Sequence, residues 1–298
     1  YGIFTNISPD HIGPGEHADF EEYLYYKTRL LNMCRIGLVN KDDEHAEQII
    51  KAADCELYTY SEKGKEADFS ASDIRYVSQP DFVGTEFHIS GKYDMEVRLG
   101  IPGLFNVVNA LAAVSVCSFL DLDKEKISHA LEHIRVNGRM EIVYTSERCT
   151  VLVDYAHNAV SMESLLSTLR DYKPKRLVCV FGCGGNRSKD RRYSMGEIGG
   201  KLADLSIITA DNSRYEKVED IIADIRGSIE KTGGSFIEIP DRREAIRYSV
   251  FHAEPGDMIA VIGKGHEDYQ EINGVRHHFL DREVIEEAVR ELREKEQG

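Results

Sequence analysis

Glycines and basic residues follow the apolar segment Leu177–Phe181, and these residue types in this order can bind an anion. The segment has the length and β-branched content of a buried strand. It runs into Gly182–Gly185, a turn that can expose backbone N–H groups. Arg187 and further cations just beyond it are suited to hold phosphates or carboxylates. The alternative interpretation is a tight turn beside a solvated, charged surface.

Similar polar clusters follow other predicted strands of the second half. Asp154–His157, Asp211–Arg214 and Gly263–Asp268 each come directly after a short apolar run, whereas the opposite ends carry ordinary turns such as Lys173-Pro174. Ligands of parallel α/β sheets bind beyond the carboxyl ends of the strands. We therefore expect these loops to meet at one edge of a sheet and to form a single site.

The elements that must position these loops alternate along the chain. Apolar runs predict strands at 150–153, 177–181, 205–209, 235–239 and 258–262, and helical patterns lie at 160–171, 193–203, 218–231 and 241–252. Such alternation predicts an α/β fold, a parallel sheet with helices on both faces. A hairpin at Asn273-Gly274 and a final helix over 282–294 complete this part.

The first half reads as a separate mixed α/β region that ends near Gly138–Cys149. Strands are predicted at 2–7, 34–39, 55–60, 74–77, 82–89 and 95–99, and helices at 20–32, 44–53, 107–120 and 122–134. His11 lies in a polar loop after the first strand, where a loop histidine is the default because the spacing matches no zinc motif. Lys27 is expected on the apolar side of its helix, where it either snorkels or reacts as a free amine. Asn106 and Asn109 begin a helix and either cap it or hold a ligand base.

Composition narrows the class of protein. The chain has 298 residues and a formal net charge of −15, which argues against a nucleic-acid binder or a membrane-surface binder. No apolar run reaches about 18 residues, the length that a membrane helix needs. Six scattered cysteines without a CxxC pair favour a reduced, cytoplasmic setting.

Several segments, taken together, resemble the Mur ligases, which are ATP-dependent amide ligases of peptidoglycan precursor synthesis. The matching segments follow the family's order along the whole chain: FTNISPDH (4–11), EEYLYYK (21–27), GLFNVVNALAA (103–113), NGRME (137–141), VDYAHN (153–158), FGCGGNR (181–187), DNSR (211–214) and GKGHEDYQ (263–270). The family pattern differs at two positions, since it has proline at 213 and aspartate at 186.

The resemblance implies a domain arrangement. Residues 1–140 would be the later part of a central ATPase domain, and residues 141–298 a Rossmann-like acceptor amino-acid-binding domain. The 298 residues contain no GxxGKT phosphate loop, and the chain begins without Met. We therefore expect a fragment or processed chain that lacks the phosphate loop and is inactive alone.

The resemblance also implies roles for single residues. Lys27 matches a carbamylated lysine that holds Mg²⁺, and His11 matches a histidine near that metal. The resemblance implies that the ATP-binding positions are Asn106, Asn109, Arg139, Asp154 and His157.

For the acceptor amino acid, the resemblance implies meso-diaminopimelate, added to UDP-N-acetylmuramoyl-L-alanyl-D-glutamate through an acyl phosphate. The matching acceptor-binding positions are Arg187, Asp211, Asn212, Ser213, Arg214, Gly263 and Glu267. Three alternatives stay open: a lysine-adding ligase of the family, a relative such as a folylpolyglutamate or cyanophycin synthetase, and a non-catalytic acceptor-binding fragment.

Overall fold

The computed structural model describes residues 1–9, 12–13 and 15–297, which group into two compact units. The first unit comprises Tyr1–Tyr76 and Gly84–Ile134, and the second comprises Val77–Val83 and Arg135–Gly298. Both units are α/β, with sheets whose strands are mainly parallel. The α/β fold expected from the sequence is confirmed.

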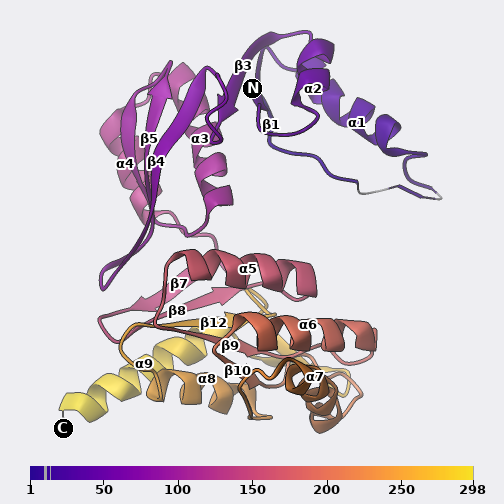
Figure 1. Ribbon diagram of the computed structural model, residues 1–298, viewed down its shortest axis with the longest axis vertical. Coiled ribbons are helices and arrows are strands. Elements are labelled where there is room, and N and C mark those ends of the chain that lie inside the picture. Colours follow the sequence, from indigo (N-terminus) through magenta and orange to yellow (C-terminus); the bar gives the residue numbers. More distant parts are fainter. Residues whose placement is uncertain (10–11, 14, 298) are drawn as a thin grey trace. The chain divides into compact units, whose positions relative to one another are not determined.

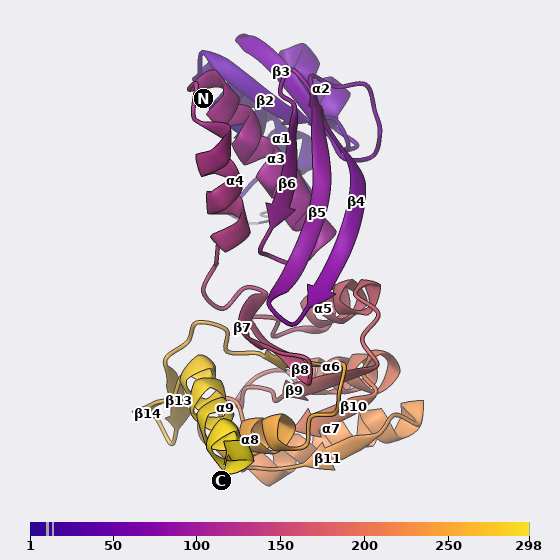
Figure 2. The ribbon, with the colours of Figure 1, turned by 90° about the vertical axis from the view of Figure 1, so that its left-hand side faces the viewer.

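The first unit is built on a sheet with the strand order β1-β2-β3-β4-β5-β6, and Figure 2 labels the strands from β2 to β6. Its strands are β1 (Gly2–Phe4), β2 (Ile36–Asn40), β3 (Glu56–Ser61), β4 (Phe69–Gln79), β5 (Phe82–Gly91) and β6 (Met95–Leu99). Its helices are α1 (Phe20–Thr28), the 3₁₀ turn η1 (Arg29–Asn32), α2 (Ala46–Ala52), α3 (Leu104–Phe119) and α4 (Lys124–His133). Separate apolar clusters join the sheet to α3 and α4 and to α1 and α2.

The second unit has the strand order β11-β10-β9-β12-β8-β7. Its strands are β7 (Glu141–Thr145), β8 (Cys149–Asp154), β9 (Arg176–Phe181), β10 (Leu205–Ile208), β11 (Phe236–Glu238) and β12 (Asp257–Ile262), and a separate hairpin joins β13 (Tyr269–Ile272) to β14 (Val275–His278). Its helices are α5 (Ala159–Asp171), α6 (Lys189–Leu202), α7 (Val218–Thr232), α8 (Arg242–Phe251) and α9 (Asp281–Gln297). Helices α5 and α6 cover one side of this sheet and α8 and α9 the other (Figure 1).

Apolar strands fix the centre of the second sheet. Every residue of β8 and β12 is buried, because each strand is mostly apolar and has sheet neighbours on both edges. Polar side chains instead govern where helices begin: Asn158 and Ser161 form a capping box at α5, and Asp241 caps α8. The loops between these elements are therefore anchored at both ends.

The structure differs from the expected elements at several places. Helix α6 begins at Lys189 rather than at 193, since Ser188 caps it, and the helix predicted over 20–32 tightens into a 3₁₀ turn after Thr28. Strand β4 spans 11 residues, where the sequence predicted only 74–77. Strand β7, an antiparallel edge strand with a bulge, was not predicted.

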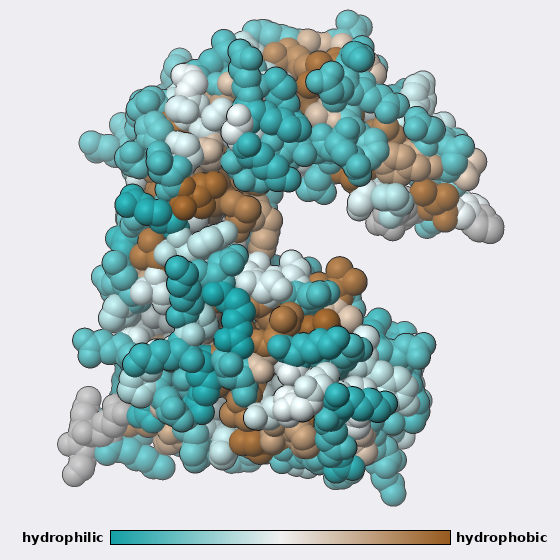
Figure 3. Space-filling model, in the orientation of Figure 1, coloured by the Kyte–Doolittle hydropathy of each residue, from teal (hydrophilic) through white to brown (hydrophobic). Residues whose placement is uncertain are grey.

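Hydrophilic side chains cover much of the face of each unit that Figure 3 presents, with hydrophobic ones exposed between them. Every helix within the described residues is too short or too polar to cross a membrane. All six cysteines are described, and they are free thiols.

Candidate functional site

The polar loops of the second unit begin at the same level of the sheet. Ile262 at the end of β12 pairs with Asp154 at the end of β8, and Ile208 of β10 pairs with Phe181 of β9. Val261 of β12 pairs with Val180 of β9, so the ends of all four strands lie at the same level. The strands are parallel, so the loops that follow β8, β9, β10 and β12 all leave at one edge. The expected meeting of these loops is confirmed.

The loop after β10 is almost fully buried. Asp211, Asn212 and Ser213 are 9%, 5% and 3% exposed. The Asn212 carbonyl accepts a hydrogen bond of 2.8 Å from Gly185 N, which ties this loop to the glycine turn after β9. A Cβ at Gly185 would collide with the Ser213 carbonyl, so only glycine permits this approach.

Arg214 is the cation of this loop, and its backbone is in the left-handed region with φ 52°. Its Nη1 donates to the Gly185 carbonyl at 2.9 Å, and its Nε lies 3.6 Å from Glu271 Oε2. The backbone is fixed as well, because Arg214 N donates to Glu271 O and Asn273 N donates to Arg214 O. The side chain keeps 22% exposure, and its guanidinium has N–H groups left for an anion.

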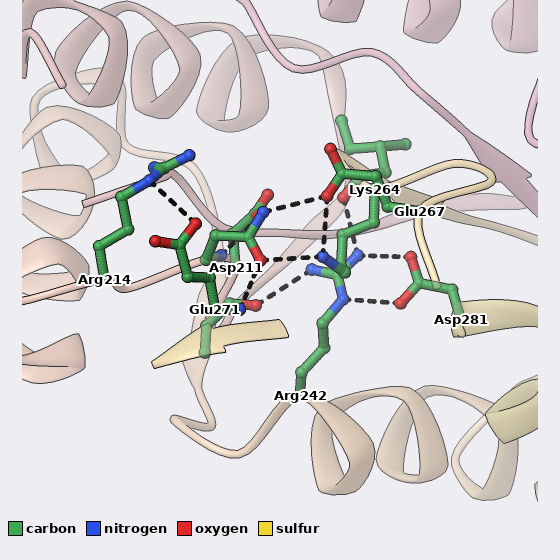
Figure 4. A network of polar contacts seen from close by, with 10 residues as sticks. Asp211, Arg214, Arg242, Lys264, Glu267, Glu271 and Asp281 are labelled. Atoms are coloured by element: carbon green, nitrogen blue, oxygen red, sulfur yellow. Dashed lines mark hydrogen bonds and ion pairs between the residues drawn. The ribbon is translucent and has the colours of Figure 1, made fainter. Parts of the chain in front are cut away.

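The loop after β12 faces the Asp211 loop. Gly263 has φ 110°, and a Cβ there would lie 2.8 Å from Asp211 Oδ2. Glu267 Oε2 accepts hydrogen bonds from Asn212 Nδ2 at 3.0 Å and from Lys264 Nζ at 3.1 Å (Figure 4). Asp211, Asn212, Arg214, Gly263 and Glu267 therefore lie in one connected region, as expected.

Two buried cations of this region were not predicted. Lys264 has 0% exposure and also donates to Asn212 Oδ1 at 3.2 Å. Arg242 comes from α8 and makes two hydrogen bonds of 2.7 Å to Asp281. Burial lowers the pKa of Arg242, but the Asp281 charge and hydrogen bonds outweigh burial, so the pKa is raised.

Arg242 also reaches the backbone of both site loops. It donates to the carbonyls of Ala210 at 3.2 Å and Ile262 at 2.9 Å, the residues immediately before Asp211 and Gly263. Figure 4 shows its guanidinium between Asp281 and the loop side chains. Arg242 thus links the starts of the two loops through hydrogen bonds to their backbone.

The basic segment after β9 divides into two groups. Arg187 is exposed and has no ion-pair partner in the described part of the chain, so it is available to a ligand. Arg192 is instead buried between Glu216 at 2.8 Å and Asp224 at 2.9 Å, and Lys189 pairs with Asp224 at 3.0 Å. The expectation that the whole basic segment faces an anion is wrong for Arg192 and Lys189, because helix α6 turns them toward α7.

Asn186 connects this segment to the Asp211 loop. Its Oδ1 accepts from Tyr215 N at 3.1 Å, and its own N–H donates to Glu216 Oε1. Its backbone is left-handed, with φ 52°, a conformation that asparagine tolerates.

A second group of candidate residues lies around Asp154. Asp154 accepts hydrogen bonds from Met140 N at 2.8 Å and Ala156 N at 2.7 Å. Burial raises the pKa of its carboxyl, and these hydrogen bonds oppose that rise. The Arg139 guanidinium lies 4.9 Å from the centroid of the Tyr155 ring.

His157 lies beside the same ring, since its Nδ1 is 2.9 Å from the Tyr155 carbonyl and the two ring centroids are 4.8 Å apart. His266 of the loop after β12 also lies near the Tyr155 ring, at 5.5 Å between centroids. The Asp154 group therefore adjoins the Glu267 loop.

In the first unit, Asn109 lines a hollow of about 580 Å³ at the start of α3. The other lining residues are Asn6, Asn40, Asp42, Asp43, Glu44, Glu62, Lys63, Leu104, Phe105 and Val108. Asn106 is held nearby, because its Nδ2 donates to the Pro102 carbonyl at 2.7 Å and its Oδ1 accepts from Asn109 at 3.4 Å. Phe105 is 49% exposed and offers an aromatic face beside this hollow.

The expected position of Lys27 on an apolar face is wrong. Lys27 is exposed, and its ammonium lies over the Tyr23 ring at 5.2 Å. The buried positions of α1 are Tyr23, Leu24 and Thr28, which turns Lys27 to the surface. His11 lies outside the described residues.

Two family models match the chain. The Mur ligase middle domain matches residues 1–117, and the Mur ligase glutamate ligase domain matches residues 138–265.

Curated relatives match almost the whole chain. A protein of Clostridium acetobutylicum named UDP-N-acetylmuramoyl-L-alanyl-D-glutamate–2,6-diaminopimelate ligase 2 is 40% identical over 97% of this chain and 59% of its own length. A ligase of the same name, without the numeral, from Caldanaerobacter subterraneus is 38% identical over 97% of this chain and 59% of its own length. The chain thus spans about 59% of the curated relatives it matches.

Solved structures agree with these matches. A UDP-N-acetylmuramoyl-L-alanyl-D-glutamate–2,6-diaminopimelate ligase superposes with a TM-score of 0.77 and 34% identity, over 98% of this chain and 60% of that one. A folylpolyglutamate synthase from Thermotoga maritima is 20% identical, with a TM-score of 0.59 over 80% of this chain and 55% of its own. That second likeness shows the fold alone.

Proposed function

The chain belongs to the Mur ligase family, and from that premise we propose that it forms the acceptor-binding part of an ATP-dependent amide ligase. The proposed reaction joins meso-diaminopimelate to UDP-N-acetylmuramoyl-L-alanyl-D-glutamate. In it, ATP phosphorylates the D-glutamate side-chain carboxylate, and ADP leaves. The acceptor amine then attacks the acyl carbon, an amide forms, and phosphate and a proton are released.

One observation carries the proposal: Arg214 and Glu267, of opposite charge, are held in adjoining loops by Asn212 and Glu271. An ammonium and a carboxylate on one carbon are complementary to such a pair. meso-Diaminopimelate carries that combination at its far end, whereas lysine ends in an ammonium alone. A lysine would bring no second carboxylate to Arg214, and that missing contact disfavours it.

The remaining acceptor-site positions have matching chemistry. Arg187 is exposed and suits a second carboxylate of the acceptor. Asp211, Ser213 and Gly263 shape the wall, since the space beside Gly263 is filled by the Asp211 carboxylate.

For ATP, we propose that Asn106 and Asn109 hold the base beside the hollow of the first unit. The hollow offers amide groups and the Phe105 ring, which suit a nucleobase. Arg139, Asp154 and His157 of the second unit are proposed to contact the phosphates and ribose. The setting is proposed to be the cytoplasm, where both nucleotide substrates occur.

Mg²⁺ does not fit the residues as they stand. Lys27 carries an exposed ammonium that repels a cation, and no group of three His, Cys, Asp or Glu side chains suited to a metal occurs within the described residues. A carbamylated Lys27 would supply a carboxylate, and His11 would be its neighbour in the proposal. Intact-mass measurement in bicarbonate buffer tests whether the chain gains the mass of CO₂ at Lys27. The Lys27→Arg variant is the control and should not gain it. No step of the reaction is derived through the metal.

Calorimetry with the 298-residue chain tests the acceptor. We expect meso-diaminopimelate to bind and L-lysine to bind at least about tenfold more weakly, the effect of one charge-assisted contact. Arg214→Ala should weaken the binding of meso-diaminopimelate, whereas Arg226→Ala, at a half-buried arginine of α7 that pairs with Glu238, should not. Equal binding of lysine would contradict the proposed acceptor.

The activity itself requires the protein encoded by the complete gene. ATP consumption should depend on the simultaneous presence of the UDP-substrate and meso-diaminopimelate. Consumption with either substrate alone would contradict the proposed reaction.

A further inference from the structure

Lys264 is a buried cation whose polar contacts lie within the proposed acceptor site. Its side chain has 0% exposure, and its Nζ donates to Glu267 Oε2 at 3.1 Å and to Asn212 Oδ1 at 3.2 Å. The Tyr269 ring, 5.3 Å from Nζ to its centroid, occupies a further side of the ammonium. A buried ammonium requires such partners, because an unpaired charge is costly to desolvate. Lys264 therefore serves the site without being accessible to a ligand.

The two carboxylate oxygens of Glu267 have different surroundings. Oε2 accepts from both Lys264 and Asn212, at 3.1 and 3.0 Å. Within the described part of the chain, Oε1 has no such donor, and the side chain keeps 22% exposure. Oε1 is thus the oxygen left for a donor group of a ligand.

Asn212 links this arrangement to Arg214. Its Oδ1 accepts from Lys264 and also from Glu271 N at 2.9 Å. The Glu271 carbonyl in turn accepts from Arg214 N at 2.9 Å, and its carboxylate lies 3.6 Å from Arg214 Nε. Figure 4 shows Lys264 and Glu267 at one side of this network and Arg214 and Glu271 at the other. The separation of the anion-binding and cation-binding groups is therefore set by one hydrogen-bonded chain.

Arg242 cannot take over the part of Lys264. Its guanidinium is already committed to Asp281 and to the carbonyls of Ala210 and Ile262. The loss of Lys264 would therefore leave the Glu267 carboxylate without the cation that it pairs with at 3.1 Å.

We propose that Lys264 is a positioning residue that orients Glu267 to receive the far ammonium of a diamino dicarboxylic acid. The inference rests on the proposed function, since it takes diaminopimelate as the acceptor. Lys264 and Asn212 hold Oε2, and Oε1 then accepts from the ligand ammonium while Arg214 binds the neighbouring carboxylate. Selectivity for the far amine thus depends on a lysine that the ligand does not touch.

Calorimetry with two ligands separates positioning from simple stabilisation. meso-Diaminopimelate carries the far amine, whereas L-2-aminopimelate has both carboxylates but lacks that amine. Lys264→Met should weaken the binding of meso-diaminopimelate about tenfold and change that of L-2-aminopimelate less than about threefold. Lys201→Met, at an exposed lysine of α6 that pairs with Glu197 at the surface, should leave both affinities unchanged.

The possible outcomes are distinct. Equal weakening of both ligands, or unchanged binding of meso-diaminopimelate, overturns the positioning role. Thermal unfolding checks that the variant is folded; if Lys264→Met does not fold, Lys264→Leu, which also removes the N–H donors to Glu267 Oε2, takes its place in the same comparison. If the unsubstituted chain binds no meso-diaminopimelate, the proposed function fails. If it binds and Lys264→Met leaves the preference intact, only the present inference fails.

Discussion

The guanidinium of Arg242 and the carboxylate of Asp281 form a completely buried ion pair, joined by two hydrogen bonds of 2.7 Å. Arg242→Met should destabilise the chain by about 3–5 kcal/mol, because it leaves the Asp281 charge buried and unpaired. The double substitution R242M/D281L should regain most of that stability. It should still bind the acceptor more weakly, since the Ala210 and Ile262 carbonyls lose their common donor.

Urea unfolding and calorimetry measure the two effects separately. Arg243→Met is the matched control, because Arg243 is the next residue of α8 and pairs with Glu287 at the surface, where an ion pair contributes about 0–1 kcal/mol. A single Arg242 variant as stable as the Arg243 variant would contradict this role of Arg242.

Gly263→Ala should impair the site through the backbone. The φ of 110° is strained for alanine, and the new Cβ would lie 2.8 Å from Asp211 Oδ2. We expect a loss of about 1–3 kcal/mol in stability and at least about tenfold weaker acceptor binding. Gly227→Ala is the control: it lies inside α7 with open space around it, so alanine should stabilise by about 0.5–1 kcal/mol. Equal effects of the two changes would rule out this view of Gly263.

Glu216→Gln should alter the acid sensitivity of the chain. The hydrogen bond from Arg192 and that from Asn186 N lower the pKa of Glu216. A lowered folded-state pKa contributes stability above the unfolded value of about 4.3, and this contribution is lost as the pH falls through the folded value. The variant should therefore be less stable than the unsubstituted chain at pH 7, with a difference that narrows below pH 4. Urea midpoints at several pH values measure this, and a difference that stays constant with pH would refute it.

Asn186→Ala and Asn186→Asp should differ in acceptor binding. Alanine removes the acceptor for the Tyr215 N–H and suits the left-handed backbone poorly, so binding should weaken. Aspartate keeps an oxygen that can accept the Tyr215 N–H. The aspartate variant should therefore bind the acceptor within about threefold of the unsubstituted chain, a smaller change than the loss of one charge-assisted hydrogen bond would cause. Calorimetry with meso-diaminopimelate decides, and weaker binding by the aspartate variant than by the alanine variant would reverse this interpretation.

Periodicity and glycine placement predicted most elements of the second unit. Continuous apolar runs such as β9 and β12 and the Asn273-Gly274 turn are local features, and the structure confirms them. Strand β7 was missed because it is an antiparallel edge strand with a bulge and partly exposed residues.

The charged residues were harder to interpret than the apolar ones. Lys264 and Arg242 stand in sequence contexts that resemble solvent-exposed loop and helix ends, and each has a partner far away in the sequence, Asn212 for Lys264 and Asp281 for Arg242. Burial of a single charge depends on those distant partners, so no local pattern could reveal it. Lys27 was placed wrongly because Tyr23, an amphipathic residue, is buried in α1. Which lysines and arginines are buried and paired can therefore be known only from the folded structure.

Strand β12 lies between β8 and β9 in the sheet, although the ribosome makes it long after both. During translation, the edges of β8 and β9 that later pair with β12 therefore stay unpaired, and unpaired strand edges favour aggregation. Closing the long intervening loop slows folding. Synthesis must thus proceed past Ile262 before the proposed acceptor site can form in the nascent protein, and a polypeptide released before that point lacks a central strand of its second sheet.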